Sequence, residues 1–361
     1  MTDPSLAVAD VAAALPLAQP RLPRWAPVLV AVLAVAAAGL PALLLGWSPV
    51  GWLLLALVLF LGGLPLWALL VENRRSAVDR LMTSLIWTAF GIAVVPLVWL
   101  IWTVVKFGAP RINGEFLTYS MRNVVGDGGG IYHALIGTLL VTGAAALISV
   151  PVGLFAAIYL VEYGKGNKLA RIITFLVDVM TGIPSIVAGL FALALFVLIF
   201  GPEIRMGFGG AVALSLLMIP IVVRSTEEML RLVPDDLREA AYALGVPKWR
   251  TITRVVLPTA LGGIITGVTL AIARVIGETA PLLVVAGKTD SVNTNLFNER
   301  MTTLPVYIYY SFTQPGVAPF GESEAPGIAR AWAAALVLIV IVMVLNLLAR
   351  VVGKIFAPSK G

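Results

Sequence analysis

The sequence predicts an all-α protein that crosses the membrane about eight times, and three observations support this fold class. Of its 361 residues, 60% are hydrophobic and only 12% are charged, whereas soluble domains carry about 25% charged residues. The mean hydropathy is +0.98. The apolar residues also fall into long runs, each near or above the roughly 20 residues that a helix needs to cross a bilayer.

These runs define the predicted elements. We expect membrane segments, in chain order, at Pro27–Gly46, Gly51–Val71, Leu81–Val105, Tyr132–Val161, Ile172–Gly201, Gly209–Met229, Val255–Ala286 and Ala329–Val352. The link Trp47–Val50 joins the first two as a hairpin, and the polar linker Glu72–Arg80 separates this hairpin from the rest. The predicted organisation is a disordered cytoplasmic N-terminus (1–26), an extra hairpin (27–72), a six-helix body (81–352) and a cytoplasmic tail (353–361).

The positions of lysine and arginine predict the orientation. With both termini in the cytoplasm, the cytoplasmic loops hold more than twice as many lysines and arginines as the outer loops, as the positive-inside rule requires. The outer loops are then Lys106–Ile131 and Lys288–Ile328, and both are too short to be domains. The net charge of +6 follows from this bias, so we expect membrane lipid and no nucleic acid as a partner.

Patterns that could indicate an enzyme do not hold up. The tripeptide at Gly287–Thr289 lacks the upstream glycine of a phosphate-binding loop, because position 282 is Leu282. The glycine run Gly126–Gly130 lacks the strand–turn–helix setting of a dinucleotide site. His133 is the single histidine, and the chain has no cysteine. We therefore expect no catalytic residues and no metal site.

The loop between the sixth and seventh segments, residues 233–258, is the most specific stretch. Asp235 and Asp236 follow a proline and suit the start of a short helix, which we expect over Leu237–Leu244. Within it, Ala240 and Ala241 offer a face with almost no side chain. Gly245 can supply the turn that ends this helix.

The spacing of this loop resembles the EAA loop of ABC importer permeases. Glu239-Ala240-Ala241 is followed at the family's spacing by Gly245 and by Leu257-Pro258, with Val255 where isoleucine is common. The resemblance implies a coupling helix that docks into a groove on a separate ATPase subunit. ATP and Mg would be bound by that ATPase, and this chain would hold no cofactor.

Two charges interrupt the apolar stretch Leu257–Gly287, namely Arg274 and Glu278. An arginine in mid-membrane costs about 2.5–3.5 kcal/mol on insertion scales, which indicates a function. Residues four apart share a helix face, and small residues continue this face at Gly267 and Ala271. We expect the pair to line a narrow pathway in the middle or outer half of the membrane; an ion pair that joins two helices is the alternative.

The chemistry of this pair favours an oxyanion. A guanidinium can donate two parallel N–H bonds to a tetrahedral oxyanion. A carboxylate can accept a hydrogen bond from hydrogen phosphate but not from a fully deprotonated anion. An Arg/Glu site is therefore hypothesised to prefer phosphate to sulfate.

Three segments extend the resemblance: "ARVIGETAPLL" at 273–283, "DVMTGIPSIVAGLF" at 178–191 and the last segment at 329–350. Over residues 81–352, the chain is similar to the PstA family of phosphate importer permeases. The resemblance implies a heterodimer with the sister permease PstC, two copies of the ATPase PstB and a phosphate-binding protein, PstS, at the bacterial inner membrane. It also implies that Arg274 and Glu278 match the charged pair of the translocation path. The hairpin at 27–72 departs from the family's pattern.

Other readings stay open at this point. A permease for sulfate or molybdate would use the same class of site. A secondary transporter could use Arg274 and Glu278 as a proton relay, but the inverted repeats typical of that class are not visible. In the fifth segment we expect Pro184 to kink the helix, Ser185 to satisfy the freed carbonyls, and Asp178 to pair with a basic neighbour.

Overall fold

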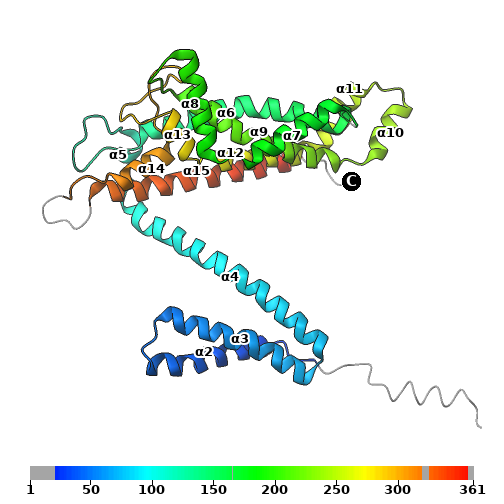
Figure 1. The fold of residues 1–361 in the computed structure, drawn as a ribbon, viewed down its shortest axis with the longest axis vertical. Helices are drawn as coiled ribbons and strands as arrows, with labels where there is room; N and C mark the ends of the chain where they lie inside the picture. Colours follow the sequence, from blue (N-terminus) through cyan, green and yellow to red (C-terminus); the bar gives the residue numbers. More distant parts are fainter. Residues whose placement is uncertain (1–20, 165, 319–324, 357–361) are drawn as a thin grey trace, which may run out of the picture. The chain divides into compact units, whose positions relative to one another are not determined.

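The computed structural model describes residues 21–164, 166–318 and 325–356, which form helices and loops without a strand (Figure 1). Seven helices in this part of the chain are long and apolar enough to cross a membrane, and one bent helix pair gives an eighth span if it counts as one. The predicted all-α membrane fold is confirmed. The orientation of the termini stays a prediction, and the disorder expected over residues 1–26 falls mostly outside the described residues.

The chain divides into two compact units, Met1–Ile101 and Trp102–Gly361. In the first unit, α2 (Ala26–Leu44) packs against α3 (Pro49–Val71). The helices approach closely because their buried positions are mostly alanines, including Ala34, Ala38 and Ala56. The predicted hairpin is therefore present.

The linker expected at Glu72–Arg80 is mostly helical, because α4 runs from Arg74 to Gly108. Asn73 begins this helix by accepting a hydrogen bond from the backbone N–H of Ser76 at 2.8 Å. The Glu72 carboxylate, just before the helix, accepts from Arg80 and from the backbone N–H of Leu22, both at 2.6 Å. Two charged residues of the predicted polar linker, Glu72 and Arg80, thus form a small polar cluster at the helix start.

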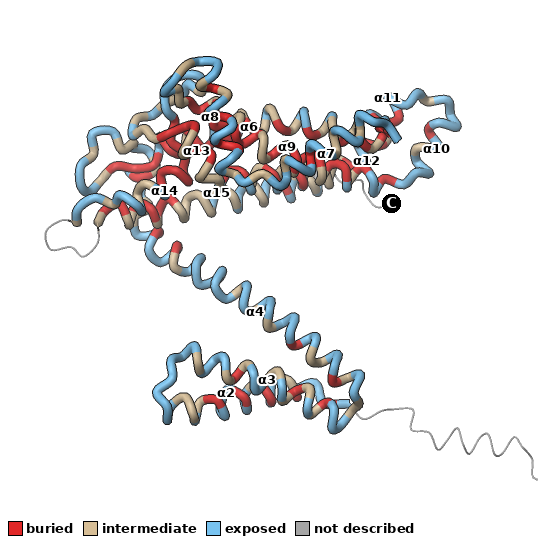
Figure 2. Tube along the Cα trace, in the orientation of Figure 1, coloured by how far each residue is buried: buried red, intermediate tan, exposed pale blue. Residues whose placement is uncertain are grey.

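In the second unit, here called the body, α6 (Tyr132–Ile158) and α9 (Gly207–Arg231) pack along each other. A Cβ added at Gly153 would lie 2.7 Å from a Val222 methyl carbon, so the two backbones need a glycine at this contact. Leu214 and Met218 of α9 are fully buried in the core cluster. Figure 2 shows that buried residues gather where the helices of the body meet.

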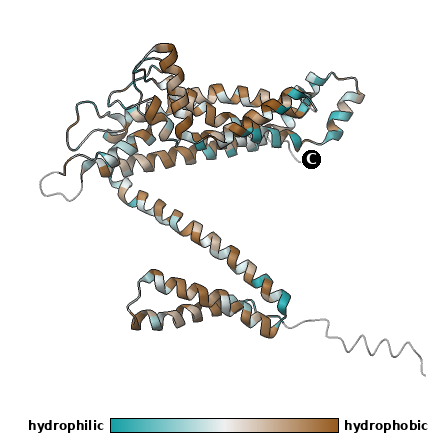
Figure 3. Cartoon of the chain, in the orientation of Figure 1, coloured by the Kyte–Doolittle hydropathy of each residue, from teal (hydrophilic) through white to brown (hydrophobic). Residues whose placement is uncertain are grey.

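Two further helices complete this packing. α12 (Leu257–Val275) contacts both α9 and the last helix, α15 (Pro326–Phe356). The predicted outer loops contain short helices, α5 (Gly114–Thr118) and α14 (Leu304–Thr313), whose buried residues pack with α15. Figure 3 shows hydrophobic residues along the helices of the body and hydrophilic ones near its ends.

The predicted fifth segment is two helices rather than one kinked helix. α7 (Lys168–Gly182) and α8 (Ser185–Phe200) meet at an angle of 110° across Ile183 and Pro184. A proline removes a backbone donor and disfavours helix in the residue before it. Here these effects end the first helix. The carbonyl of Pro184 accepts the first amide bonds of α8. Among the described residues, the Ser185 hydroxyl donates to no carbonyl that the break leaves free, contrary to expectation.

Candidate functional site

The seventh segment is also broken, between the two residues that the sequence singled out. α12 ends at Val275 and a second short helix, α13, runs from Ala280 to Val285. Arg274 therefore lies in the last turn of α12, and Glu278 lies in the non-helical stretch that follows. The two residues do not share one helix face, so the expectation of a continuous helix was wrong here.

Arg274 belongs to an exposed stripe along α12. Thr266 and Leu270 precede it at steps of four residues, which places all three on one face; all three are exposed, Leu270 by 62%. The small residues that were expected to line the same path instead face inward. Gly267 is buried, and a Cβ added there would lie 2.6 Å from the Ser225 hydroxyl of α9.

Arg274 and Glu278 make no ion pair with each other. Within the part of the chain that the structure describes, neither side chain has a hydrogen bond or salt bridge. The alternative of a structural ion pair between helices of this chain therefore has no support. The guanidinium and the partly buried carboxylate are both available to another molecule.

The two motif segments that suggested a family meet in the body. α8 packs against α13, and a Cβ added at Gly189 would lie 2.6 Å from the Cα of Pro281. Only glycine allows this approach, because any side chain at position 189 would overlap the Pro281 backbone. The bent pair α7–α8 thus supports the break that carries Glu278.

The cytoplasmic loop of the sequence prediction forms α10 (Asp235–Ala243) and α11 (Lys248–Thr251). Gly245 lies between them with φ +72°, and a Cβ there would meet nothing within 4 Å. Glu239 and Ala240 are exposed, whereas Ala241 is buried. The predicted helix is present, but only one of its two alanines is on the free surface.

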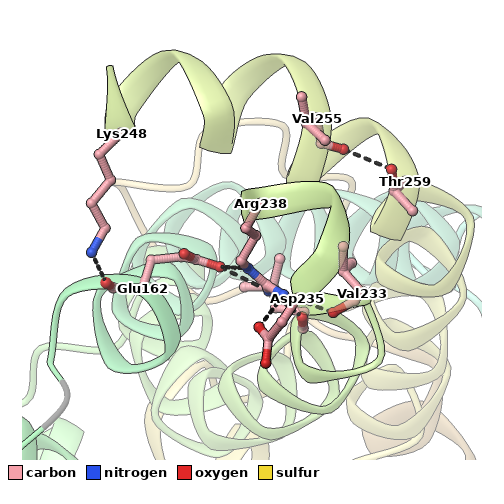
Figure 4. A network of polar contacts seen from close by, with 8 residues as sticks. Glu162, Val233, Asp235, Arg238, Lys248, Val255 and Thr259 are labelled. Atoms are coloured by element: carbon pink, nitrogen blue, oxygen red, sulfur yellow. Dashed lines mark hydrogen bonds and ion pairs between the residues drawn. The ribbon is translucent and has the colours of Figure 1, made fainter. Parts of the chain in front are cut away.

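A buried ion pair that the sequence reading missed holds α10 in place. The Arg238 guanidinium donates to the Glu162 carboxylate at 3.0 and 3.1 Å (Figure 4), and the two side chains are 12% and 5% exposed. Glu162 lies in the π-helical turn Tyr159–Tyr163 that follows α6. The same guanidinium donates to the backbone carbonyls of Leu230 and Val233 at 2.9 and 2.7 Å.

A second cation completes this contact. The Lys248 ammonium donates to the backbone carbonyl of Glu162 and lies 4.8 Å from the centre of the Tyr163 ring. α10 and α11 are therefore both attached to the end of α6, the helix that packs along α9 through the body. A charge at the end of an otherwise apolar segment, as at Glu162, was the signal that could have revealed this pair.

Asp178 has the basic partner that the sequence predicted. It pairs with Arg224 of α9, which also bonds Glu227 at 2.9 Å. Glu227 in turn bonds Arg231 at 2.5 Å. This network joins α7 to α9. No group of three or more metal-ligating side chains occurs among the described residues.

Comparisons with known proteins agree with this architecture. Residues 149–360 match the family described as "Binding-protein-dependent transport system inner membrane component". An alginate ABC transporter chain of known structure superposes with a TM-score of 0.52 at 15% identity, over 75% of this chain and 96% of that chain. The protein therefore belongs to the membrane components of binding-protein-dependent transport systems.

Two curated relatives narrow the family. "Phosphate transport system permease protein PstA 1" of Mycobacterium tuberculosis (strain CDC 1551 / Oshkosh) is 48% identical over 282 residues, which cover 77% of this chain and 90% of the relative. The PstA protein of Haemophilus influenzae is 40% identical over 276 residues, covering 76% of this chain and 94% of that protein. Within its class, the chain is a member of the PstA permease family.

Proposed function

We propose that this chain is the permease subunit of an ATP-driven importer for inorganic phosphate and forms half of the translocation path. The observation that carries the proposal is the exposed Arg274 in the last turn of α12, which has no partner among the described residues, in a chain whose relatives are named phosphate permeases. An arginine within an apolar membrane segment is costly when it has no partner. A passing oxyanion, or a facing subunit, supplies the missing partner.

The break after α12 gives Glu278 a separate role. Because it lies outside both helices, its carboxylate can turn toward or away from Arg274 with little change elsewhere. It accepts a hydrogen bond from the protonated oxygen of hydrogen phosphate, and it repels anions that lack such a proton. This asymmetry favours phosphate over sulfate or molybdate, the alternative cargo.

The partners follow from the two ends of the body. The exposed stripe of α12 with Arg274 fits a sister permease of the PstC type, so that two such stripes enclose one path. α10, with the exposed Glu239 and Ala240, and the turn at Gly245 fit the groove of a PstB-type ATPase, two copies of which bind ATP and Mg; Ala241 is buried behind this surface. A PstS-type binding protein delivers phosphate to the opposite end.

Uptake by the assembled transporter tests this assignment. We expect Arg274→Gln to abolish uptake of radiolabelled phosphate in cells, because the neutral amide cannot offset the charge of the anion. Arg274→Lys keeps the charge but not the planar fork and should retain a measurable fraction of uptake. Both variants should co-purify with the ATPase as the wild type does. Normal uptake by Arg274→Gln would contradict the assignment.

A further inference from the structure

A polar pocket separate from Arg274 and Glu278 is lined by residues of α14, of α15 and of the loops that follow α5 and α13. Figure 1 shows α5 and α14 at the end of the body opposite α10. The volume of the pocket is about 70 Å³. A water molecule takes up about 30 Å³ of the liquid, so the pocket has room for roughly two waters or one small tetrahedral anion. Its polar lining includes Lys288, Asp290, Tyr307, Ser311, Gln314 and Arg330.

Arg330 in this pocket is a buried cation that has no counter-charge in the part of the chain that the structure describes. It is 8% exposed, and its guanidinium donates to the backbone carbonyls of Gly126 and Gly128 at 2.9 and 3.2 Å. No carboxylate of the described residues lies within ion-pair distance of it. Buried charges are normally paired with an opposite charge, so this guanidinium indicates an anion.

Tyr307 is a second, independent sign of a ligand. Its side chain lines the pocket and is 3% exposed, yet among the described residues its hydroxyl has no partner at hydrogen-bond geometry, the nearby Ser311 side chain being the one candidate. The adjacent ring of His133, 5.5 Å away between ring centres, also leaves both nitrogens without a partner. A buried hydroxyl of this kind usually bonds another group or an ordered water.

The remaining charges add a chemical preference. Lys288 lies 3.6 Å from Asp290 and 5.2 Å from the centre of the Tyr310 ring. The lining therefore carries two cations and one carboxylate. A carboxylate beside an anion site disfavours a fully deprotonated oxyanion, but it accepts a hydrogen bond from one that carries a proton.

We infer that this pocket binds one hydrogen phosphate ion, held by Arg330, Lys288 and the Tyr307 hydroxyl, with Asp290 accepting from its protonated oxygen. The inference rests on the proposed function and adds to it a waiting site, separate from Arg274 and Glu278. Phosphate released at this end of the body would be held here before it enters the path.

Equilibrium dialysis with radiolabelled inorganic phosphate tests this site on the membrane complex purified with its sister permease and ATPase but without the binding protein. All variants carry Arg274→Gln, which removes the cation of the path. The Arg274→Gln complex should still bind phosphate. Adding Tyr307→Phe, which keeps the ring and removes only the hydroxyl, should weaken binding about tenfold, since the lost bond goes to a charged group.

Tyr309→Phe is the matched control, because it removes an exposed hydroxyl from the same helix and should leave binding unchanged. A purely structural Tyr307 predicts equal affinity in both variants, and that result would overturn the inference. If the wild-type transporter did not take up phosphate, that result would count against the proposed function. Failure of the pocket and failure of the proposed function are therefore distinguishable.

One further variant tests which anion the pocket prefers, and a double variant tests whether a carboxylate of this chain occupies the pocket instead. Asp290→Asn should reduce the preference for phosphate over sulfate; an unchanged preference would remove Asp290 from the site. Glu322 and Glu324 lie outside the described residues, so Glu322→Gln/Glu324→Gln asks whether this chain's own carboxylates occupy the pocket. Unchanged phosphate binding supports the inference, whereas binding that appears only in the double variant overturns it.

Discussion

A single guanidinium links α10 to the end of α6. Arg238 bonds one carboxylate and two backbone carbonyls inside the structure, and it bonds a second carboxylate, Asp235, at 3.1 Å on the surface. The Glu162 carboxylate is buried, whereas the Asp235 side chain is 77% exposed. The same cation therefore offers a buried and an exposed ion pair for direct comparison.

We expect Glu162→Gln to destabilise the chain and to weaken ATPase association. Removing one partner of a buried pair leaves an uncompensated charge and costs about 3–5 kcal/mol. The cost should approach the lower end of this range, because the glutamine amide oxygen can still accept from Arg238. Thermal unfolding in detergent measures the stability, and co-purification measures the association.

Asp235→Asn is the matched control for that experiment. An exposed ion pair contributes about 0–1 kcal/mol, so this variant should unfold within about 1 kcal/mol of the wild type. If the two variants lost equal stability, α10 would not depend on the buried pair. Arg238 would then act only on the surface.

Glu72 gives the one pH-dependent expectation at this scale. The hydrogen bonds from Arg80 first, and from the Leu22 amide second, hold the pKa of the Glu72 carboxyl below its usual value of 4.5 despite its burial. A lowered pKa in the folded state means that this contribution to stability is present above pH 4.5. It is lost as the pH falls through the lower, folded pKa.

We therefore expect the protease resistance of the α2–α3 hairpin to fall as the pH is lowered below about 4.5. In Glu72→Gln, which cannot ionise, resistance should be lower at neutral pH and should change less over the same range. Limited proteolysis with an acid-stable protease at several pH values measures both. A wild type and variant with parallel profiles would show that Glu72 does not contribute.

At the scale of helices, the sequence predicted which segments exist better than where they break. The length of an apolar run identifies a membrane segment but does not show where the helix changes direction. α7 and α8 were therefore predicted as one span, although they meet at 110°. The break between Val275 and Ala280 was hidden for a related reason. Its residues Gly277 and Thr279 are compatible with a helix locally, and only packing, such as Pro281 against Gly189, sets the new direction.

The turn after α10 provides a test of the proposed docking to the ATPase. Gly245 has φ +72°, and a Cβ there would meet no described atom within 4 Å, so in the proposed complex a side chain there would contact the ATPase. We expect Gly245→Leu to lower ATPase co-purification or coupled ATP hydrolysis strongly. The cost in permease stability should be only the strain of a non-glycine residue at positive φ, about 1–2 kcal/mol.

Gly201→Leu is the matched control, because Gly201 has φ +95° and equally open surroundings but lies at the end of α8, away from α10. Its ψ of 174° makes this backbone region almost exclusive to glycine, so leucine there should carry at least as much strain. If Gly201→Leu lowered ATPase association as much as Gly245→Leu, the effect would come from strain, and docking at this turn would lose its support.

At the scale of the whole molecule, the sequence predicted the fold class, the hairpin and the short helix α10, because apolar length, polar spacing and a motif suffice for these. It found Arg274 and Glu278 as misplaced charges but assigned them a shared helix face that the structure does not have. The Arg238–Glu162 pair could not be predicted, since it joins residues 76 positions apart and no local pattern encodes such a contact.

The N-terminal hairpin gives a prediction at this largest scale. The residues proposed for the path, for coupling and for the second phosphate pocket all lie in the unit Trp102–Gly361, and the family match covers 149–360. Deleting residues 26–71 removes two membrane crossings together, so the orientation of the later helices is kept. It also retains Arg21 and Arg24 before the first remaining helix, as the positive-inside rule favours. We expect the shortened chain to assemble and to import radiolabelled phosphate at no less than about half the wild-type rate, since neither end of the body loses a residue.

Deleting only residues 26–48 is the matched control, because it removes one crossing, reverses the expected topology and should abolish uptake. A correctly inserted chain without 26–71 that imports no phosphate would show that the hairpin takes part in transport.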